Sequence, residues 1–106
     1  MLTNHKKYLK TIYKSIKKNL PNSHVYLFGS VLGGKLVGGS DIDILILAEV
    51  PEKHMRRAEI ITDIEKDASL PYVHPFDFHL ITQAEFEDWN AIYNLTIKPM
   101  KEYLKI

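Results

Sequence analysis

Residues 24–47 read HVYLFGSVLGGKLVGGSDIDILIL, and this stretch predicts how the chain folds. The apolar residues at 25–28 indicate a first strand, and a glycine-rich segment follows it. A second strand covers residues 41–47 and begins with the letters DID. Because this second strand is apolar on both sides after its first residues, we expect it to lie buried between layers of the fold.

Two acids, Asp41 and Asp43, stand at the beginning of this second strand. Alternate residues of a strand share a face, so these side chains project from one face with Cα atoms about 6 to 7 Å apart. Like charges about 4 Å apart repel by about 4 kcal/mol at an effective dielectric constant near 20, and a cation relieves that repulsion. Carboxylate oxygens favour Mg²⁺ or Mn²⁺. The alternative is that Asp41 belongs to a turn and Asp43 is a solvated edge residue.

Gly29 and Ser30 form the other half of the pattern, at the end of the first strand. A glycine there lets the backbone approach a ligand closely, while the following amides and the Ser30 hydroxyl can face a phosphate. Together with a metal-binding pair, this arrangement predicts a nucleoside triphosphate that is held with its metal.

The ordered pattern of Gly29-Ser30, ten residues and then SDID resembles the signature of the DNA polymerase β-like nucleotidyltransferase superfamily. With a chain this short, it most closely resembles the minimal nucleotidyltransferases that are paired with HEPN-domain proteins in prokaryotes. The resemblance covers most of the chain. It implies an α/β (α+β) nucleotidyltransferase fold like the palm of polymerase β, with a small mixed sheet flanked by helices.

One departure from the superfamily pattern concerns a basic residue. Many members read Gly-Ser-x-Ala-Arg-Gly, whereas Gly33 occupies the basic position here. Lys35, two positions further on, is the candidate to replace it at the nucleotide. Without such a replacement, we expect weak affinity for the triphosphate.

A third strand is predicted over residues 72–82, with Asp77 and His79 on one face and large apolar residues on the other. If it pairs beside strand 41–47, neighbouring backbones lie about 4.8 Å apart and Asp77 can join the cation cluster. The resemblance implies the same third carboxylate. His79 has two interpretations, contact with the nucleotide or metal, or a hydrogen-bonded and half-buried histidine.

Three helices are predicted around these strands. One covers residues 3–19, a second covers residues 51–66, and a third opens with the capping box TQAE at residues 82–85 and continues to Pro99. Between Ser30 and the second strand we expect one short helical turn and a loop. The order helix, strand, strand, helix, strand, helix is typical of an α/β sandwich.

The helix at 51–66 should pack on the sheet through one apolar side. Met55 is expected to fill a gap in the core from this helix. Arg56 and Arg57 are expected on its outer side, exposed to solvent.

The C-terminal part of the chain is rich in apolar side chains. Trp89 and Tyr93 are expected to complete the core from the third helix. Residues 100–106 form an apolar tail that we expect to be only partly buried and to offer a docking surface.

The composition predicts one soluble domain over residues 1–106, with no room for a second, substrate-binding domain. A formal net charge of +1 argues against nucleic acid as a direct ligand. The absence of cysteine excludes disulfides and thiolate chemistry. Without a membrane-length apolar run or a signal peptide, we expect a cytoplasmic protein. Homo-oligomerisation is left open.

We therefore predict transfer of a nucleotide, most simply AMP from ATP, to a hydroxyl on a HEPN toxin partner, with this chain as the antitoxin. Asp41 and Asp43 would ligate two Mg²⁺ ions, with Mn²⁺ as an alternative, and Asp77 would ligate the ion that activates the acceptor. Gly29 and Ser30 would bind the phosphates. The rival is an antitoxin or binding subunit without activity, which covers the active site of a HEPN ribonuclease.

Overall fold

The structure is a computed structural model that describes residues 5–28, 42–71, 74–94 and 96–106. In chain order its elements are α1 (His5–Asn19), β1 (His24–Phe28), β2 (Ile42–Leu47), α2 (His54–Asp67), β3 (Phe76–Ile81), α3 (Gln83–Tyr93), β4 (Ile97–Pro99) and α4 (Met100–Leu104). The short helical turn expected after Ser30 lies outside the described residues.

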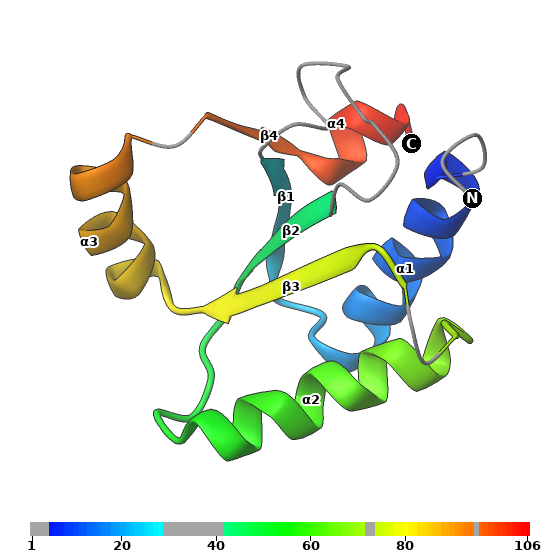
Figure 1. Ribbon diagram of the computed structural model, residues 1–106, viewed down its shortest axis with the longest axis horizontal. Coiled ribbons are helices and arrows are strands. Elements are labelled where there is room, and N and C mark those ends of the chain that lie inside the picture. Colours follow the sequence, from blue (N-terminus) through cyan, green and yellow to red (C-terminus); the bar gives the residue numbers. More distant parts are fainter. Residues whose placement is uncertain (1–4, 29–41, 72–73, 95) are drawn as a thin grey trace.

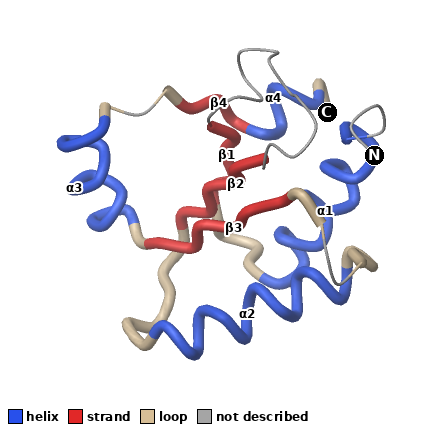
Figure 2. The backbone as a smooth tube through the Cα atoms, in the orientation of Figure 1, coloured by secondary structure: helices blue, strands red, loops and turns tan. Residues whose placement is uncertain are grey.

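One mixed sheet lies at the centre of the molecule, with the helices around it (Figure 1, Figure 2). Its strand order is β3-β2-β1-β4. Strand β1 pairs antiparallel with both β2 and β4, whereas β2 and β3 are parallel. Two parallel neighbours need a crossover connection, and α2 supplies it. The predicted α/β class with a small mixed sheet is confirmed.

The core lies on one face of β2. Ile42, Ile44 and Ile46 are completely buried there, and they belong to one apolar cluster with residues of α1 and α2. The two helices also contact each other directly, because the buried Ser15 hydroxyl donates a hydrogen bond of 2.7 Å to the Ile64 carbonyl. Burial of one such aliphatic side chain contributes roughly 1.5–3 kcal/mol. This face therefore supplies much of the stability of the domain.

Helix α2 is turned differently from the prediction. Met55 was expected in the core but is 77% exposed, and Arg57 was expected outside but is only 6% exposed. The reason is that Arg57 and Ile64 are two turns apart, so the buried stripe of the helix runs through both. Arg56, the neighbour of Arg57, is exposed as predicted.

Three hydrogen bonds explain how the Arg57 guanidinium can be buried. It donates to the Pro51 carbonyl at 2.6 Å, to the Leu80 carbonyl at 3.4 Å and to the Glu85 carboxylate at 2.8 Å. A buried charge is tolerated when its donors are satisfied in this way. Arg57 thus joins α2 to the end of β3 and to the first turn of α3.

The C-terminal elements were predicted only in part. The capping box is present, since the Thr82 hydroxyl accepts from the Glu85 amide and the Glu85 carboxylate accepts from the Thr82 amide. However, α3 ends at Tyr93 because Asn94 takes the left-handed conformation, with φ 48°. Ile97, which was expected in this helix, instead pairs with Phe28 in the sheet.

The apolar tail and α3 also differ from expectation. The tail forms α4, whose Met100 and Leu104 are 0% and 6% exposed and belong to the core, although Ile106 is 49% exposed. Conversely, no residue of α3 is buried, and Tyr93 is 63% exposed. The core is thus completed by α4, which covers part of the sheet next to α1, and not by Trp89 and Tyr93. None of the described helices is long and apolar enough to cross a membrane.

The burial of Arg57 generates a stability prediction. Arg57→Met keeps an apolar stem but removes the charged hydrogen bonds, so we expect a loss of about 1–3 kcal/mol. This corresponds to a fall in melting temperature of several degrees for a domain of this size. Arg56→Met is the matched control, because its pair with Glu59 is exposed and exposed pairs contribute about 0–1 kcal/mol. Equal losses in both variants would contradict a structural role for Arg57.

A second prediction concerns the stability of the fold at low pH. The Thr82 backbone amide, and after it the Arg57 guanidinium, hold the pKa of Glu85 below its ordinary value of 4.5. The carboxylate therefore stabilises the fold above the pKa of the unfolded state, and this stability is lost as pH falls through the lower folded-state pKa. Glu85→Gln can keep the capping bond. By calorimetry, we expect the melting temperature of Glu85→Gln to be lower than that of the wild type at neutral pH. The two melting temperatures should converge below pH 4.5.

Candidate active site

The predicted third carboxylate lies directly beside the second. Strands β2 and β3 pair in parallel, and in their register Asp43 is opposite Asp77. Adjacent strands are about 4.8 Å apart, so the two side chains are neighbours on one face of the sheet. This face is opposite to the one that carries Ile42, Ile44 and Ile46. The expectation that the Asp77 strand pairs beside the Asp43 strand is confirmed.

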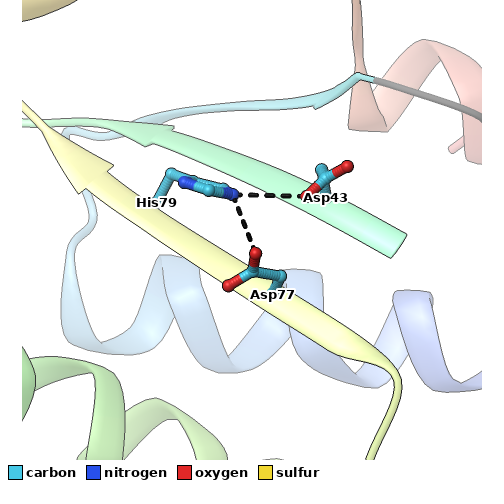
Figure 3. Close-up of side chains that lie close together, drawn as sticks. All are labelled: Asp43, Asp77 and His79. Atoms are coloured by element: carbon cyan, nitrogen blue, oxygen red, sulfur yellow. Dashed lines mark hydrogen bonds and ion pairs between the residues drawn. The ribbon is translucent and has the colours of Figure 1, made fainter. Parts of the chain in front are cut away.

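His79 joins the two acids. It follows Asp77 by two residues, so it lies on the same face of β3, opposite Leu45. Its Nε2 atom is 3.3 Å from Asp43 Oδ1 and 3.3 Å from Asp77 Oδ2, and Figure 3 shows the imidazole pointing between the two carboxylates. Of these side chains, Asp43 and His79 are 27% and 28% exposed and Asp77 is 53% exposed. The cluster is therefore half-buried, and a ligand can reach it past Asp77.

Aromatic rings surround the imidazole. The ring centroid of His79 is 5.1 Å from that of Phe28 on β1 and 5.6 Å from that of Trp89 on α3. The Trp89 ring also contacts Phe28 edge to face, with 5.7 Å between centroids. For its other neighbour, Tyr93, the distance between ring centroids is 6.2 Å. Phe28 is opposite Asp43 in the ladder and immediately precedes Gly29 in the sequence. These rings fix the position of His79 and form an apolar wall beside the acids.

The sequence did not identify this wall. The helical spacing of Trp89 and Tyr93 was interpreted as a core-facing stripe, which is its commoner meaning. The signal for a site lay in the strands instead, where an acid and a histidine alternate with buried apolar residues. That alternation located His79 correctly but left its role open.

A cavity of about 450 Å³ adjoins the cluster. It lies between α2, the end of β3 and α3, and its lining includes His79, Trp89, Arg57 and Glu85. A second cavity, of about 860 Å³, is lined by residues 19–24, 47–49 and 82–84. It contains none of the acids of the cluster. Asp43 and Asp77 do not line the smaller cavity either, but it reaches the cluster at His79, whereas the larger cavity does not reach it.

The donor atoms of the cluster fit a divalent cation. Asp43, Asp77 and His79 each offer one ligand atom, and these atoms lie within 4.8 Å of one another. Two carboxylates supply charge for a hard cation, and an imidazole nitrogen is a further donor. The other predicted site residues, Gly29, Ser30, Lys35 and Asp41, lie outside the described residues. Their assignment remains a prediction.

The fold and the cluster define a class of protein, an α/β domain whose neighbouring strands carry an acidic site suited to a divalent cation. Comparison with known proteins specifies the class further. The chain belongs to the nucleotidyltransferase domain family, whose model matches residues 9–101. The predicted family is thereby confirmed, and no curated protein is similar enough in sequence to count as a match.

Solved structures have the same fold. A crystal structure of a candidate nucleotidyltransferase is 32% identical, with a TM-score of 0.61, and the match covers 84% of this chain and 90% of that one. A candidate nucleotidyltransferase from Sulfolobus solfataricus is 24% identical, with a TM-score of 0.60 and coverage of 78% and 71%. A toxin-antitoxin structure with AMP-PNP is 24% identical, with a TM-score of 0.58 and coverage of 87% and 71%. The last two support the fold alone.

Trp89 makes cation binding at this site measurable. It is the only tryptophan of the chain, and its ring packs on the imidazole of the cluster. Because Mn²⁺ is paramagnetic, we expect it to quench Trp89 fluorescence in a saturable titration. Asp43→Asn removes a ligand charge and should shift the titration at least tenfold to higher Mn²⁺. Asp63→Asn, an exposed acid on α2, is the control. An equal response of both variants would refute binding at the cluster.

Proposed function

We propose that this nucleotidyltransferase transfers AMP from ATP, with Mg²⁺ or Mn²⁺, to a hydroxyl of a HEPN-domain toxin and so acts as its antitoxin. The observation that supports this proposal most strongly is the pairing of Asp43 with Asp77 on adjacent strands in a member of the family. A bound dication would stabilise charge on the α-phosphoryl group and on the pyrophosphate that leaves. The domain that does this would span residues 1–106.

The reaction is a substitution at phosphorus. The acceptor oxygen forms a bond to the α-phosphorus, the bond from that phosphorus to the bridging oxygen breaks, and pyrophosphate leaves with the electron pair. Asp77 is the more exposed of the two acids, so an acceptor hydroxyl can approach it and transfer its proton to that carboxylate. Asp43 is more enclosed and is suited to hold the cation, together with Asp41. Gly29, Ser30 and Lys35 would bind the phosphates.

Two observations support a protein acceptor. The resemblance of the sequence to minimal nucleotidyltransferases implies a HEPN-domain partner, and one fold neighbour is a toxin-antitoxin structure with AMP-PNP. The small net charge also gives little attraction for the phosphates of a nucleic-acid acceptor. The cavity lined by His79 and Trp89 reaches the cluster at His79 and is a place where an acceptor segment can lie.

A second candidate function is an antitoxin that only covers the active site of a HEPN ribonuclease. The observation that favours it is Gly33, which stands where the superfamily pattern has a basic residue. If Lys35 does not replace that charge, the triphosphate would be bound weakly and the fold would serve as a scaffold. The retained acids Asp43 and Asp77 favour the enzyme, because a scaffold has no need for two carboxylates side by side.

Intact mass spectrometry tests the enzyme directly. The protein is incubated with ATP, Mg²⁺ and the HEPN-domain protein encoded beside it, and we expect the partner to gain AMP units. Asp43→Asn should abolish the gain, whereas Asp63→Asn should not. If the Ser30 hydroxyl binds a charged phosphate oxygen, Ser30→Ala should lose about 1–3 kcal/mol of transition-state stabilisation, and the reaction should be slower. Neutralisation of the toxin by Asp43→Asn without any mass change in the wild-type reaction would establish the scaffold instead.

A further inference from the structure

We propose that His79 is a nitrogen ligand of the metal, and that the site consequently selects a first-row transition-metal ion such as Mn²⁺ over Mg²⁺. This inference rests on the metal site of the proposed function and specifies its ligands. It concerns a residue that lies outside the pattern of glycine, serine and two acids by which the superfamily was recognised.

The first argument is the symmetry of the contacts. His79 Nε2 is 3.3 Å from one oxygen of Asp43 and 3.3 Å from one oxygen of Asp77. The contact with Asp43 is a long hydrogen bond, because N–H···O distances centre on about 2.9–3.0 Å. Ligand atoms of a six-coordinate ion with bonds of about 2.1 Å are instead about 3 Å apart. A nitrogen that faces two carboxylate oxygens at equal distances is therefore compatible with three ligands around a common centre.

His74 shows what a paired histidine looks like in the same protein. Its Nε2 is 2.6 Å from Glu65 Oε2, and its Nδ1 accepts a hydrogen bond from the Phe76 amide at 3.2 Å. Both nitrogens of His74 are thus used for structure. His79, by contrast, directs Nε2 between two acids that share a face of the sheet. His74 thus has one partner at each ring nitrogen, whereas Nε2 of His79 faces two carboxylates.

The second argument is that the ring is held in place. Phe28 and Trp89 pack against the imidazole at 5.1 and 5.6 Å between ring centroids. This packing directs Nε2 toward the acids before any ion binds, which lowers the ordering cost of coordination. The protein thus places a nitrogen donor, rather than water, at the position that faces Asp43 and Asp77.

The ligand set determines the preferred ion. Mg²⁺ favours an all-oxygen shell and keeps several water molecules. An imidazole nitrogen raises affinity for first-row transition ions relative to Mg²⁺, and Mn²⁺ also accepts the two carboxylates. We therefore expect the described part of the site to bind Mn²⁺ more tightly than Mg²⁺, and His79 to be the cause of that difference.

Electron spin echo spectroscopy with Mn²⁺ alone tests this directly. Bound Mn²⁺ should show modulation from a coordinated ¹⁴N nucleus, and the pattern should change when the protein is labelled with ¹⁵N-histidine. His79→Phe keeps an aromatic ring between Phe28 and Trp89 but removes the nitrogen, so the modulation should disappear. His74→Gln is the control and should retain it. Affinity for Mn²⁺ should fall about tenfold or more in His79→Phe, with a smaller change for Mg²⁺.

A third variant separates coordination from packing. His79→Gln offers an oxygen in place of the nitrogen, so it should bind Mn²⁺ without nitrogen modulation and with less preference over Mg²⁺. Wild-type protein that binds Mn²⁺ without nitrogen modulation, or the same modulation in His79→Phe, would overturn the assignment of His79 and leave the carboxylate site standing. Wild-type protein that binds neither ion would overturn the proposed metal site as well.

Discussion

The acid pair exists because β2 and β3 pair in parallel in one register. A slip of one residue would turn every side chain of a strand to the opposite face of the sheet. Such a slip would place Asp43 among the helices and expose its apolar neighbours, Ile42 and Ile44, which are completely buried. Burial of these side chains is thus the constraint on which the site depends. The hydrophobic core fixes the distance between carboxylates that lie on the other side of the sheet.

The strands could be predicted from sequence because their signal is local. Alternation of side chains along a strand put Asp41 with Asp43, and Asp77 with His79, before any pairing was known. The structure then brought Asp43, Asp77 and His79 within one cluster. The end of α3 could not be predicted in this way, since Ile97 has helical spacing from Tyr93. The helix ends where Asn94 takes the left-handed conformation, and the strand begins at Ile97.

Tertiary contacts explain the remaining differences between the predicted and the observed burial of side chains. The local sequence around Arg57 does not identify Glu85 as its partner, because the two residues are 28 positions apart. Glu85 serves two functions at once, since it caps α3 and neutralises Arg57. Met55 is left exposed for the related reason that the helix turns the arginine inward. Sequence periodicity predicts that a helix has an inner side, but the available partners determine which side that is.

The loose attachment of α3 has a consequence for how the protein can move. No residue of this helix is buried, and Figure 1 shows it to one side of the sheet, on the opposite side from α1. The Trp89 ring and the pair between Glu85 and Arg57 link it to the rest of the domain. Segments with so few apolar contacts open at a lower free energy than the whole domain. The helix can therefore exchange its amide protons while the β2 core stays folded, although in the closed state Trp89 packs on Phe28 and His79.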